Sequence, residues 1–291
     1  MKTRLFLIIA LLWGAMIISP SFTIAQEAEY KTYKDISYTN PDETDTYKLE
    51  RLKLDIYCPV KSEGVPTIIW FHGGALKSKQ KELPPQFLEE DLIVVSPNYR
   101  LYPQAKCPAY IEDAAEAVAW TVKHITEYGG DPSKIYISGH SAGGYLALIL
   151  AMSKEYLLKY GIDADTDIAG FFPVSGQTMT HFTIREEMNM PSGIPFIDEY
   201  APIHYSRANT SRIVLITGDR TLEMSDRWEE NALFSSVNKN LGNKNIELFE
   251  LQGFNHLCIA PACYLIINKL REWEKEWGLK YYRKRYPEYF K

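Results

Sequence analysis

The sequence predicts an α/β fold in which a mostly parallel central sheet carries helices on both faces. Short, nearly continuous apolar runs, typical of strands covered on both faces, alternate along the chain with longer segments of helical periodicity. One apolar run leads directly into a Gly-x-Ser-x-Gly turn and then into a helix rich in small residues, within residues 134–152. Strands that alternate with helices in this way favour parallel pairing and helices in two outer layers.

The first part of the chain supplies the expected edge of the sheet. Residues 27–45 are polar and rich in tyrosine, and we expect an extended arm or an edge strand there. Apolar and charged residues alternate over 47–57, which predicts a half-exposed strand at an antiparallel edge. The apolar runs at 65–71 and 92–96 predict buried strands, with a loop and a short helix at 86–91 between them.

The middle of the chain is expected to form the centre of the sheet. A helix is predicted over 108–128, because a proline opens it and alanine and valine residues follow one side. The strand that precedes the Gly-x-Ser-x-Gly turn comes next, and a helix over 144–152 follows that turn. Residues 168–174 predict another strand, and the irregular stretch 177–205 is typical of a small insertion over a cleft.

The last part of the chain repeats the same alternation. We expect a strand at 212–217, a helix at 225–241, an alternating strand at 245–251 and a final helix at 261–277. No internal repeat is visible, and we expect residues 26–291 to form a single domain.

The turn around Ser141 carries the strongest chemical signal in the sequence. A strand, a Gly-x-Ser-x-Gly turn and a helix together form a nucleophile elbow, which exposes a serine hydroxyl at the tip of a strained turn. Gly139 and Gly143 remove the Cβ atoms that would clash where strand and helix pack closely. The helix directs its N–H groups and its positive dipole end toward the site. We therefore predict that Ser141 is a nucleophile.

A serine nucleophile needs a base, and His256 is the predicted one. It lies just past the last expected strand, in the loop that leads to the last helix. Loops that follow the carboxyl ends of parallel strands share one edge of the sheet, so His256 and Ser141 are expected at the same edge. There His256 could take the serine proton and return it to the leaving group. For His140, the direct neighbour of Ser141, we expect a packing role.

The acid that would orient the base is less well determined. The chain order Ser, acid, His places it after the strand at 212–217, where Asp219, Glu223 and Asp226 are candidates. Asp219 is so close to the strand end that it could instead cap the turn. Glu223 would reach the base if the loop were longer by one turn, and we favour it over Asp219.

The tetrahedral intermediate of acyl transfer needs backbone N–H donors. The Ala142 amide, which follows the nucleophile, is one candidate, and Gly73 and Gly74 supply the others because bare glycine backbone can approach an oxyanion closely. We expect His72 to fix this loop by hydrogen bonding and not to act as the base.

The N-terminus has the features of a secretory signal peptide. Lys2 and Arg4 precede an apolar run at 5–18, and small residues lead to a cut predicted after Ala25, so residues 1–25 would be removed. The apolar run is shorter than the roughly 20 residues that a membrane-spanning helix needs. We expect a secreted or periplasmic protein without a stable membrane anchor, with an uncleaved anchor as the alternative.

Charge and cysteine content exclude other classes of function. The net charge is −5, and no basic block precedes the extreme C-terminus, so nucleic-acid binding has no support. The four cysteines are Cys58, Cys107, Cys258 and Cys263. Four cysteines allow three disulfide pairings. The sequence contains no C-x-x-C pair of the kind that binds zinc, so no metal is expected.

The ordered motifs resemble the α/β-hydrolase superfamily, and within it the esterases that are similar to hormone-sensitive lipase and to bacterial feruloyl esterases. The matching segments are HGGAL at 72–76, YRLYPQAKCPAYIEDAAEAVAW at 99–120, YGGDPSKIYISGHSAGGYLAL at 128–148, and GDRTLE and GFNH further on. The resemblance implies a serine-dependent carboxylic ester hydrolase without a metal or organic cofactor. Arg100 and Asp113 would join a loop to a helix as scaffold residues. Two departures are Ala75, where a third glycine is usual, and Thr221, at the usual position of the acid.

The substrate is not determined by these motifs. By family analogy, a secreted esterase of this type would remove acetyl or feruloyl groups from carbohydrates, and the missing large lid argues against long-chain lipids. An amidase, a formamidase or a small peptidase could use the same residues. A non-catalytic binding module is a further alternative, supported by Thr221. The aromatic and basic tail at 273–290 suggests a last helix with a solvated end, or else a carbohydrate or partner surface.

Overall fold

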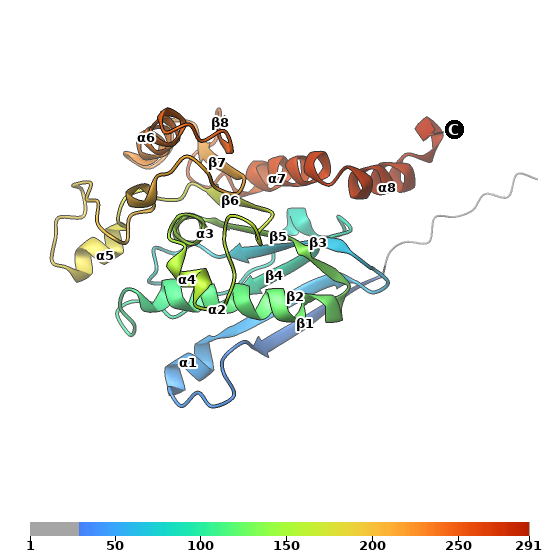
Figure 1. Ribbon diagram of the computed structural model, residues 1–291, viewed down its shortest axis with the longest axis horizontal. Helices are drawn as coiled ribbons and strands as arrows, with labels where there is room; N and C mark the ends of the chain where they lie inside the picture. Colours follow the sequence, from blue (N-terminus) through green and yellow to red (C-terminus); the bar gives the residue numbers. More distant parts are fainter. Residues whose placement is uncertain (1–28, 291) are drawn as a thin grey trace, which may run out of the picture.

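The computed structural model describes residues 29–290, and its centre is an eight-stranded sheet (Figure 1). The spatial order is β1-β2-β4-β3-β5-β6-β7-β8. Strands β3 to β8 pair in parallel, whereas β1 and β2 form an antiparallel edge against β4. The strand bounds are β1 Tyr30–Ser37, β2 Lys53–Pro59, β3 Val65–Phe71, β4 Ile93–Pro97, β5 Gly130–His140, β6 Gly170–Val174, β7 Ile213–Gly218 and β8 Ile246–Leu251. The predicted mostly parallel α/β fold is confirmed.

Helices cover both faces of the sheet. Alternate residues of each central strand point to opposite faces, and each face forms its own apolar core with the helices packed on it. Ile69 and Ile137 belong to one core and Ile68 and Tyr136 to the other. Helices α2, α3, α4 and α6 contribute to the first core and α7 and α8 to the second, on the other side of the sheet (Figure 1). The helix bounds are α1 Thr46–Arg51, α2 Ala109–His124, α3 Ala142–Met152, α4 Glu155–Leu158, α5 Phe182–Glu187, α6 Arg227–Asn240, α7 Ile259–Trp273 and α8 Lys275–Arg285.

The antiparallel edge differs from the prediction in one respect. The strand expected over 47–57 is wrong in its first half, where α1 stands, and only the second half belongs to β2. The side chain of Asp45 accepts hydrogen bonds from the amides of Tyr47 and Lys48, which starts a helix that the alternating pattern does not reveal. The outermost strand is β1, in the segment where an arm or an edge strand was expected.

Three helix predictions also need correction. The short helix expected at 86–91 is only a 3-10 turn, η1, at Pro85–Phe87. The elbow helix begins directly after Ser141 rather than at residue 144. The final helix expected at 261–277 is interrupted at Glu274, whose backbone is not helical and whose carboxylate accepts a hydrogen bond of 2.5 Å from the Tyr136 hydroxyl.

The insertion at 177–205 packs beside the loop that follows β3. It holds α5 and a 3-10 turn, η3, at Pro202–Tyr205. The Thr183 hydroxyl of α5 donates to the Ala75 carbonyl at 2.5 Å, and Lys77 forms an ion pair with Glu186. The insertion is thus fastened to the HGGAL loop, at the carboxyl-end edge of the sheet.

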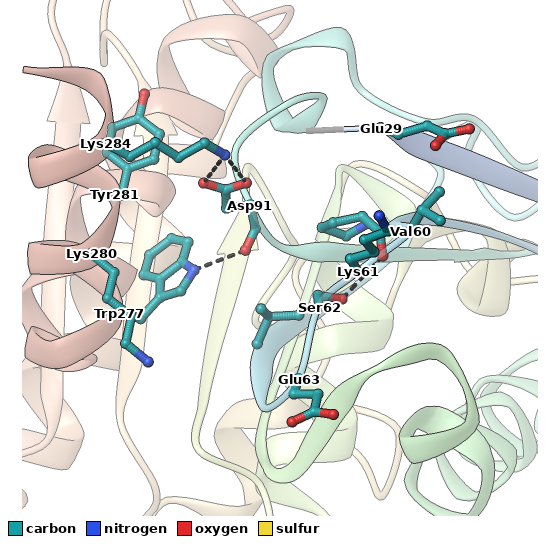
Figure 2. Close-up of a pocket in the computed structure, with 12 residues that line it drawn as sticks. Glu29, Val60, Lys61, Ser62, Glu63, Asp91, Trp277, Lys280, Tyr281 and Lys284 are labelled. Carbon is teal, nitrogen blue, oxygen red and sulfur yellow. Dashed lines mark hydrogen bonds and ion pairs between the residues drawn. The ribbon is translucent and has the colours of Figure 1, made fainter. Parts of the chain in front are cut away.

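The C-terminal helix α8 packs at the opposite edge of the sheet. Its Trp277 indole donates to the Asp91 carbonyl at 2.8 Å, and Lys284 pairs with the Asp91 carboxylate (Figure 2). The cavity of about 370 Å³ between α8 and the turn before β3 includes Val65, the first residue of that strand. Because it lies at the amino ends of the parallel strands, this cavity is remote from Ser141, which follows the carboxyl end of β5.

Candidate active site

Ser141 lies at the tip of a strained turn between β5 and α3. Its backbone has φ 57° and ψ −114°, a conformation that costs a non-glycine residue about 1–3 kcal/mol. The turn is held because the Ser141 amide donates to the Val174 carbonyl of the neighbouring strand at 2.8 Å. The Ser141 carbonyl also accepts the Tyr145 amide, at 2.9 Å, inside the first turn of α3. The sheet and the helix together therefore fix the position of the serine.

Gly143 permits the close approach of α3 to β3. A Cβ atom built at this residue would lie 2.0 Å from the Phe71 carbonyl oxygen and 2.8 Å from the His72 carbonyl oxygen. Both contacts are with backbone, which cannot move aside without displacing the end of β3 and the loop after it. The glycine of the Gly-x-Ser-x-Gly motif is thus a packing requirement.

We expect Gly143→Ala to lower the free energy of unfolding by about 3 kcal/mol or more, because the added methyl group overpacks a rigid backbone contact. Urea denaturation measures the change. Gly193→Ala is the matched control, since a Cβ there meets nothing within 4 Å. Equal stability of the two variants would contradict the packing account of Gly143.

Three side chains form a continuous hydrogen-bonded chain at the elbow. The Ser141 hydroxyl Oγ lies 3.0 Å from His256 Nε2, and His256 Nδ1 lies 2.6 Å from Glu223 Oε1. His256 is in the loop after β8 and Glu223 in the loop after β7, so both come from carboxyl ends of parallel strands. A carboxylate on Nδ1 favours the tautomer in which Nε2 is free to accept the serine proton.

Glu223 reaches His256 because the loop after β7 makes an additional turn. The amides of Leu222 and Glu223 donate to the Asp219 carbonyl, and this turn brings the glutamate side chain back toward Gly218. Its Oε2 then accepts hydrogen bonds from the Gly218 amide at 3.0 Å and from the Ser175 hydroxyl at 2.7 Å. This loop geometry is what the sequence argument for Glu223 required.

The contacts of Glu223 keep it ionised. Burial alone would raise the pKa of this carboxyl group, but hydrogen bonds from His256, the Met224 amide and Ser175 outweigh burial and lower the pKa to about 2. Glu223 is therefore an anion at neutral pH and stabilises positive charge on the His256 ring.

Asp219, the second candidate acid, does not contact His256. Its Oδ1 accepts the Thr221 amide at 2.9 Å and the Thr221 hydroxyl at 2.7 Å, and its Oδ2 accepts the Gly253 amide at 2.9 Å. These bonds, and the Gly253 amide first, lower the pKa of Asp219. Asp219 thus closes a turn and ties it to the loop that carries His256. Asp226, the third candidate, is the residue before α6 and also makes no contact with His256.

The candidate oxyanion donors lie beside the serine. A Cβ atom built on Gly73 would be 3.4 Å from Ser141 Cβ, which places the HGGAL loop against the elbow. The amides of Gly73, Gly74 and Ala142 donate to no acceptor among residues 29–290. Gly74 has φ 105°, whereas Ala75, at the usual third glycine, has φ 59°. The site thus offers free N–H groups near Ser141.

The neighbouring histidines support the loops of the site. His72 Nδ1 donates to the Gly73 carbonyl at 2.7 Å, and its ring stacks on Tyr99. His140 Nε2 donates to the His256 carbonyl at 2.7 Å. Burial lowers the pKa of His140 to about 4, so this ring is neutral. His140 therefore anchors the backbone of His256, a more specific contact than the packing role we expected.

Two contacts of the site have no signal in the sequence. Ser175 follows β6 with no motif around it, yet its hydroxyl donates to Glu223. The bond from His140 to the His256 carbonyl joins residues 116 positions apart. Arg100 and Asp113, in contrast, form the expected scaffold pair, in which the guanidinium contacts both carboxylate oxygens at 2.7–3.1 Å.

Residues 29–290 also show which metal, disulfide and membrane features this part of the chain carries. No group of three or more His, Cys, Asp or Glu side chains there could hold a metal ion. All four cysteines are free thiols. No helix of this part of the chain is both long enough and apolar enough to cross a bilayer. The predicted signal peptide at 1–25 lies outside the described residues.

Comparison with known proteins places these features in a family. Residues 54–221 match the family model BD-FAE. A probable isoprenylcysteine alpha-carbonyl methylesterase of Arabidopsis thaliana is 34% identical over 137 residues, which cover 43% of this chain and 28% of the relative. Esterase LipQ of Mycobacterium tuberculosis is 29% identical over 211 residues, which cover 66% of this chain and 50% of the relative. The match thus spans half or less of the length of these relatives.

Solved structures show the same fold. A truncated carbohydrate esterase from gut microbiota superposes with a TM-score of 0.68 at 18% identity, over 86% of this chain and 98% of the other. The family match covers more than half of the chain and includes the HGGAL loop, the elbow and β7. The chain therefore belongs to the BD-FAE family of α/β-hydrolases.

Proposed function

We propose that the protein is a serine esterase that hydrolyses carboxylic esters through an acyl-enzyme formed on Ser141. The observation that carries this proposal is the hydrogen-bonded chain from Ser141 through His256 to Glu223, beside the free amides of Gly73, Gly74 and Ala142. Relatives and structural neighbours that are named esterases support the same reaction class.

In the proposed reaction each group has its own step. His256 Nε2 takes the proton of Ser141 as Oγ attacks the ester carbonyl carbon, and the carbonyl oxygen becomes an oxyanion near the free amides. His256 then gives this proton to the departing alcohol, which leaves an acyl group on Ser141. A water molecule repeats the attack, with His256 again as base, and releases the carboxylic acid. Glu223 stabilises the imidazolium in both halves of the reaction.

Short or aromatic acyl groups on a carbohydrate are the substrates that we propose for this site. The family name BD-FAE and a structural neighbour described as a carbohydrate esterase support acetyl or feruloyl groups. The non-catalytic alternative depended on Thr221 at the usual acid position. Glu223 supplies a carboxylate at His256 in its place, so this alternative loses its support.

Hydrolysis of 4-nitrophenyl esters from acetate to octanoate tests the proposal. We expect turnover that is fastest for short acyl chains, together with slower release of acetate from acetylated xylan oligosaccharides. The matched 4-nitroanilides separate an esterase from an amidase. Turnover of the anilides but not of the esters would contradict the proposal.

We also propose that the protein is exported, since residues 2–25 have the basic, apolar and small-residue order of a signal peptide. N-terminal sequencing of the protein from a native host would detect a new terminus at Gln26. Recovery of the intact chain from the cytoplasm would contradict export.

A further inference from the structure

A cavity with charged residues in its wall lies beside the candidate active site, between the insertion and the start of α6. Its volume is about 480 Å³, and its lining includes Phe182, Arg185, Met224, Arg227 and Glu230. None of these residues takes part in the hydrogen-bonded chain at Ser141.

Two elements connect this cavity to the reacting groups. Met224, in its wall, directly follows Glu223, and its amide donates to that carboxylate at 2.9 Å. Phe182, another lining residue, begins α5, whose Thr183 hydroxyl donates to the Ala75 carbonyl of the HGGAL loop. The cavity wall therefore includes the direct neighbour of the acid and the first residue of the helix that is hydrogen-bonded to the HGGAL loop.

The cavity wall carries a buried excess of positive charge. Arg185 is 4% exposed, Arg227 3% and Glu230 6%, so the buried charged groups of the wall are two guanidinium groups and one carboxylate. A second carboxylate, that of Asp226, lines the cavity from an exposed position. Glu230 is partly engaged elsewhere, because its Oε2 accepts the Thr178 amide at 3.0 Å. Neither arginine forms an ion pair with a carboxylate among residues 29–290. A buried charge without a partner is costly, which favours occupation by an anion.

The hydrogen-bond capacity of both guanidinium groups is largely unused. Arg185 donates through Nη1 to the Ile194 carbonyl, and its buried Nε has no partner in the described part of the chain. Arg227 donates through Nη1 to the Ser175 carbonyl. Burial, followed by the positive charges of Arg227 and Arg185, lowers the pKa of the adjacent His181 well below its ordinary value. His181 is therefore neutral and adds no positive charge to that of the two guanidinium groups.

We propose that this cavity binds a carboxylate group of the substrate, so that the enzyme prefers esters that carry a negative charge near the scissile bond. Guanidinium groups suit this task because their planar N–H donors match the two oxygens of a carboxylate. The inference rests on the proposed esterase function for its kinetic consequence, but the binding of the anion itself can be measured without turnover.

Two matched pairs of esters test the preference on either side of the scissile bond. Mono-4-nitrophenyl adipate and 4-nitrophenyl hexanoate differ by a carboxylate on the acyl side, and 3-acetoxybenzoate and its methyl ester differ on the alcohol side. We expect the charged member of at least one pair to have a kcat/KM about tenfold or more higher, the range of a hydrogen bond to a charged group. Equal or lower values for the charged member of both pairs would overturn the proposal.

Variants of Arg185 test whether the preference for charged esters depends on the cavity. Arg185→Gln should lower kcat/KM for the preferred charged ester about tenfold and change the neutral ester less than about threefold, while Arg185→Lys should retain part of the preference. Arg220→Gln is the control, because it removes an equal charge from a half-exposed arginine that stacks on Trp228 outside the cavity. Equal losses in the Arg185 and Arg220 variants would show a general charge effect and overturn the assignment.

Calorimetric titration separates the cavity from catalysis. Ser141→Ala protein is titrated with monomethyl adipate and with dimethyl adipate, which it should not hydrolyse. We expect the monoanion to bind about tenfold more tightly, and Arg185→Gln in the same background to remove this difference. That result together with no ester turnover by the native protein would contradict the esterase proposal and support the cavity. Equal binding of the two compounds would overturn the cavity proposal, whatever the activity.

Discussion

Replacing Ser141 by alanine is expected to lower kcat for short 4-nitrophenyl esters by about 10⁶-fold, to the rate supplied by the oxyanion donors and by binding alone. Without Oγ no acyl-enzyme forms, and His256 Nε2 loses the group it would deprotonate 3.0 Å away. The substitution leaves the elbow in place, because the turn is held by the backbone bonds of Ser141 to Val174 and Tyr145. The melting temperature should therefore stay close to that of the native protein.

The His256→Ala variant and the double variant Ser141→Ala/His256→Ala test whether Ser141 and His256 act together. If serine and histidine act as one unit, the single and double variants should lose nearly equal factors, because either loss already removes the nucleophilic pathway. Rates are measured with an active-site titration of the native protein to exclude trace contamination. Losses that multiply in the double variant, or a Ser141→Ala protein within tenfold of native activity, would contradict a nucleophilic Ser141.

Much of the fold follows from local pattern. The strands predicted at 65–71, 92–96 and 212–217 are apolar runs, as expected for strands buried on both faces. The observed bounds of each strand lie within one or two residues of the predicted ones. The errors fall where one tertiary or capping contact decides the structure. Asp45 starts a helix inside an alternating pattern, and Glu274 ends one where the apolar periodicity continues.

In the candidate site, too, some residues could be predicted from local sequence patterns, whereas others depend on contacts in three dimensions. Ser141, Gly73 and His256 could be placed from sequence, because parallel topology brings the loops after different strands to one edge. The choice between Glu223 and Asp219 depended on the length of a loop, which the pattern does not encode. The contacts of Ser175 with Glu223 and of His140 with the His256 carbonyl depend on side-chain directions in three dimensions, so no local pattern indicates them.

Replacing Glu223 by alanine is the second large effect that we expect, with a loss of about 10³- to 10⁴-fold in kcat. The loss should be smaller than for Ser141→Ala, because the serine and the base retain partial function without the acid. Asp219→Ala is the matched control: it removes a carboxylate from the same loop that contacts Thr221 and Gly253 but not His256. Its kcat should remain within about tenfold of the native value, with a small decrease in the free energy of unfolding because the bonds to Thr221 and Gly253 are lost.

Acid titration of stability gives a second, independent measure of Glu223. Its pKa in the folded protein, about 2, is below the value of about 4.3 of a free glutamate, so ionised Glu223 stabilises the fold above pH 4. This contribution is lost as the pH falls from about 5 toward 2. Glu223→Gln removes the titrating group and keeps the shape of the side chain, so its stability should fall less steeply over this range. Two results would contradict the assignment of Glu223 as the acid. One is a larger loss of activity in Asp219→Ala than in Glu223→Ala. The other is the same acid profile of stability for the native and the Glu223→Gln protein, because Glu223 would then carry no charge that His256 depends on.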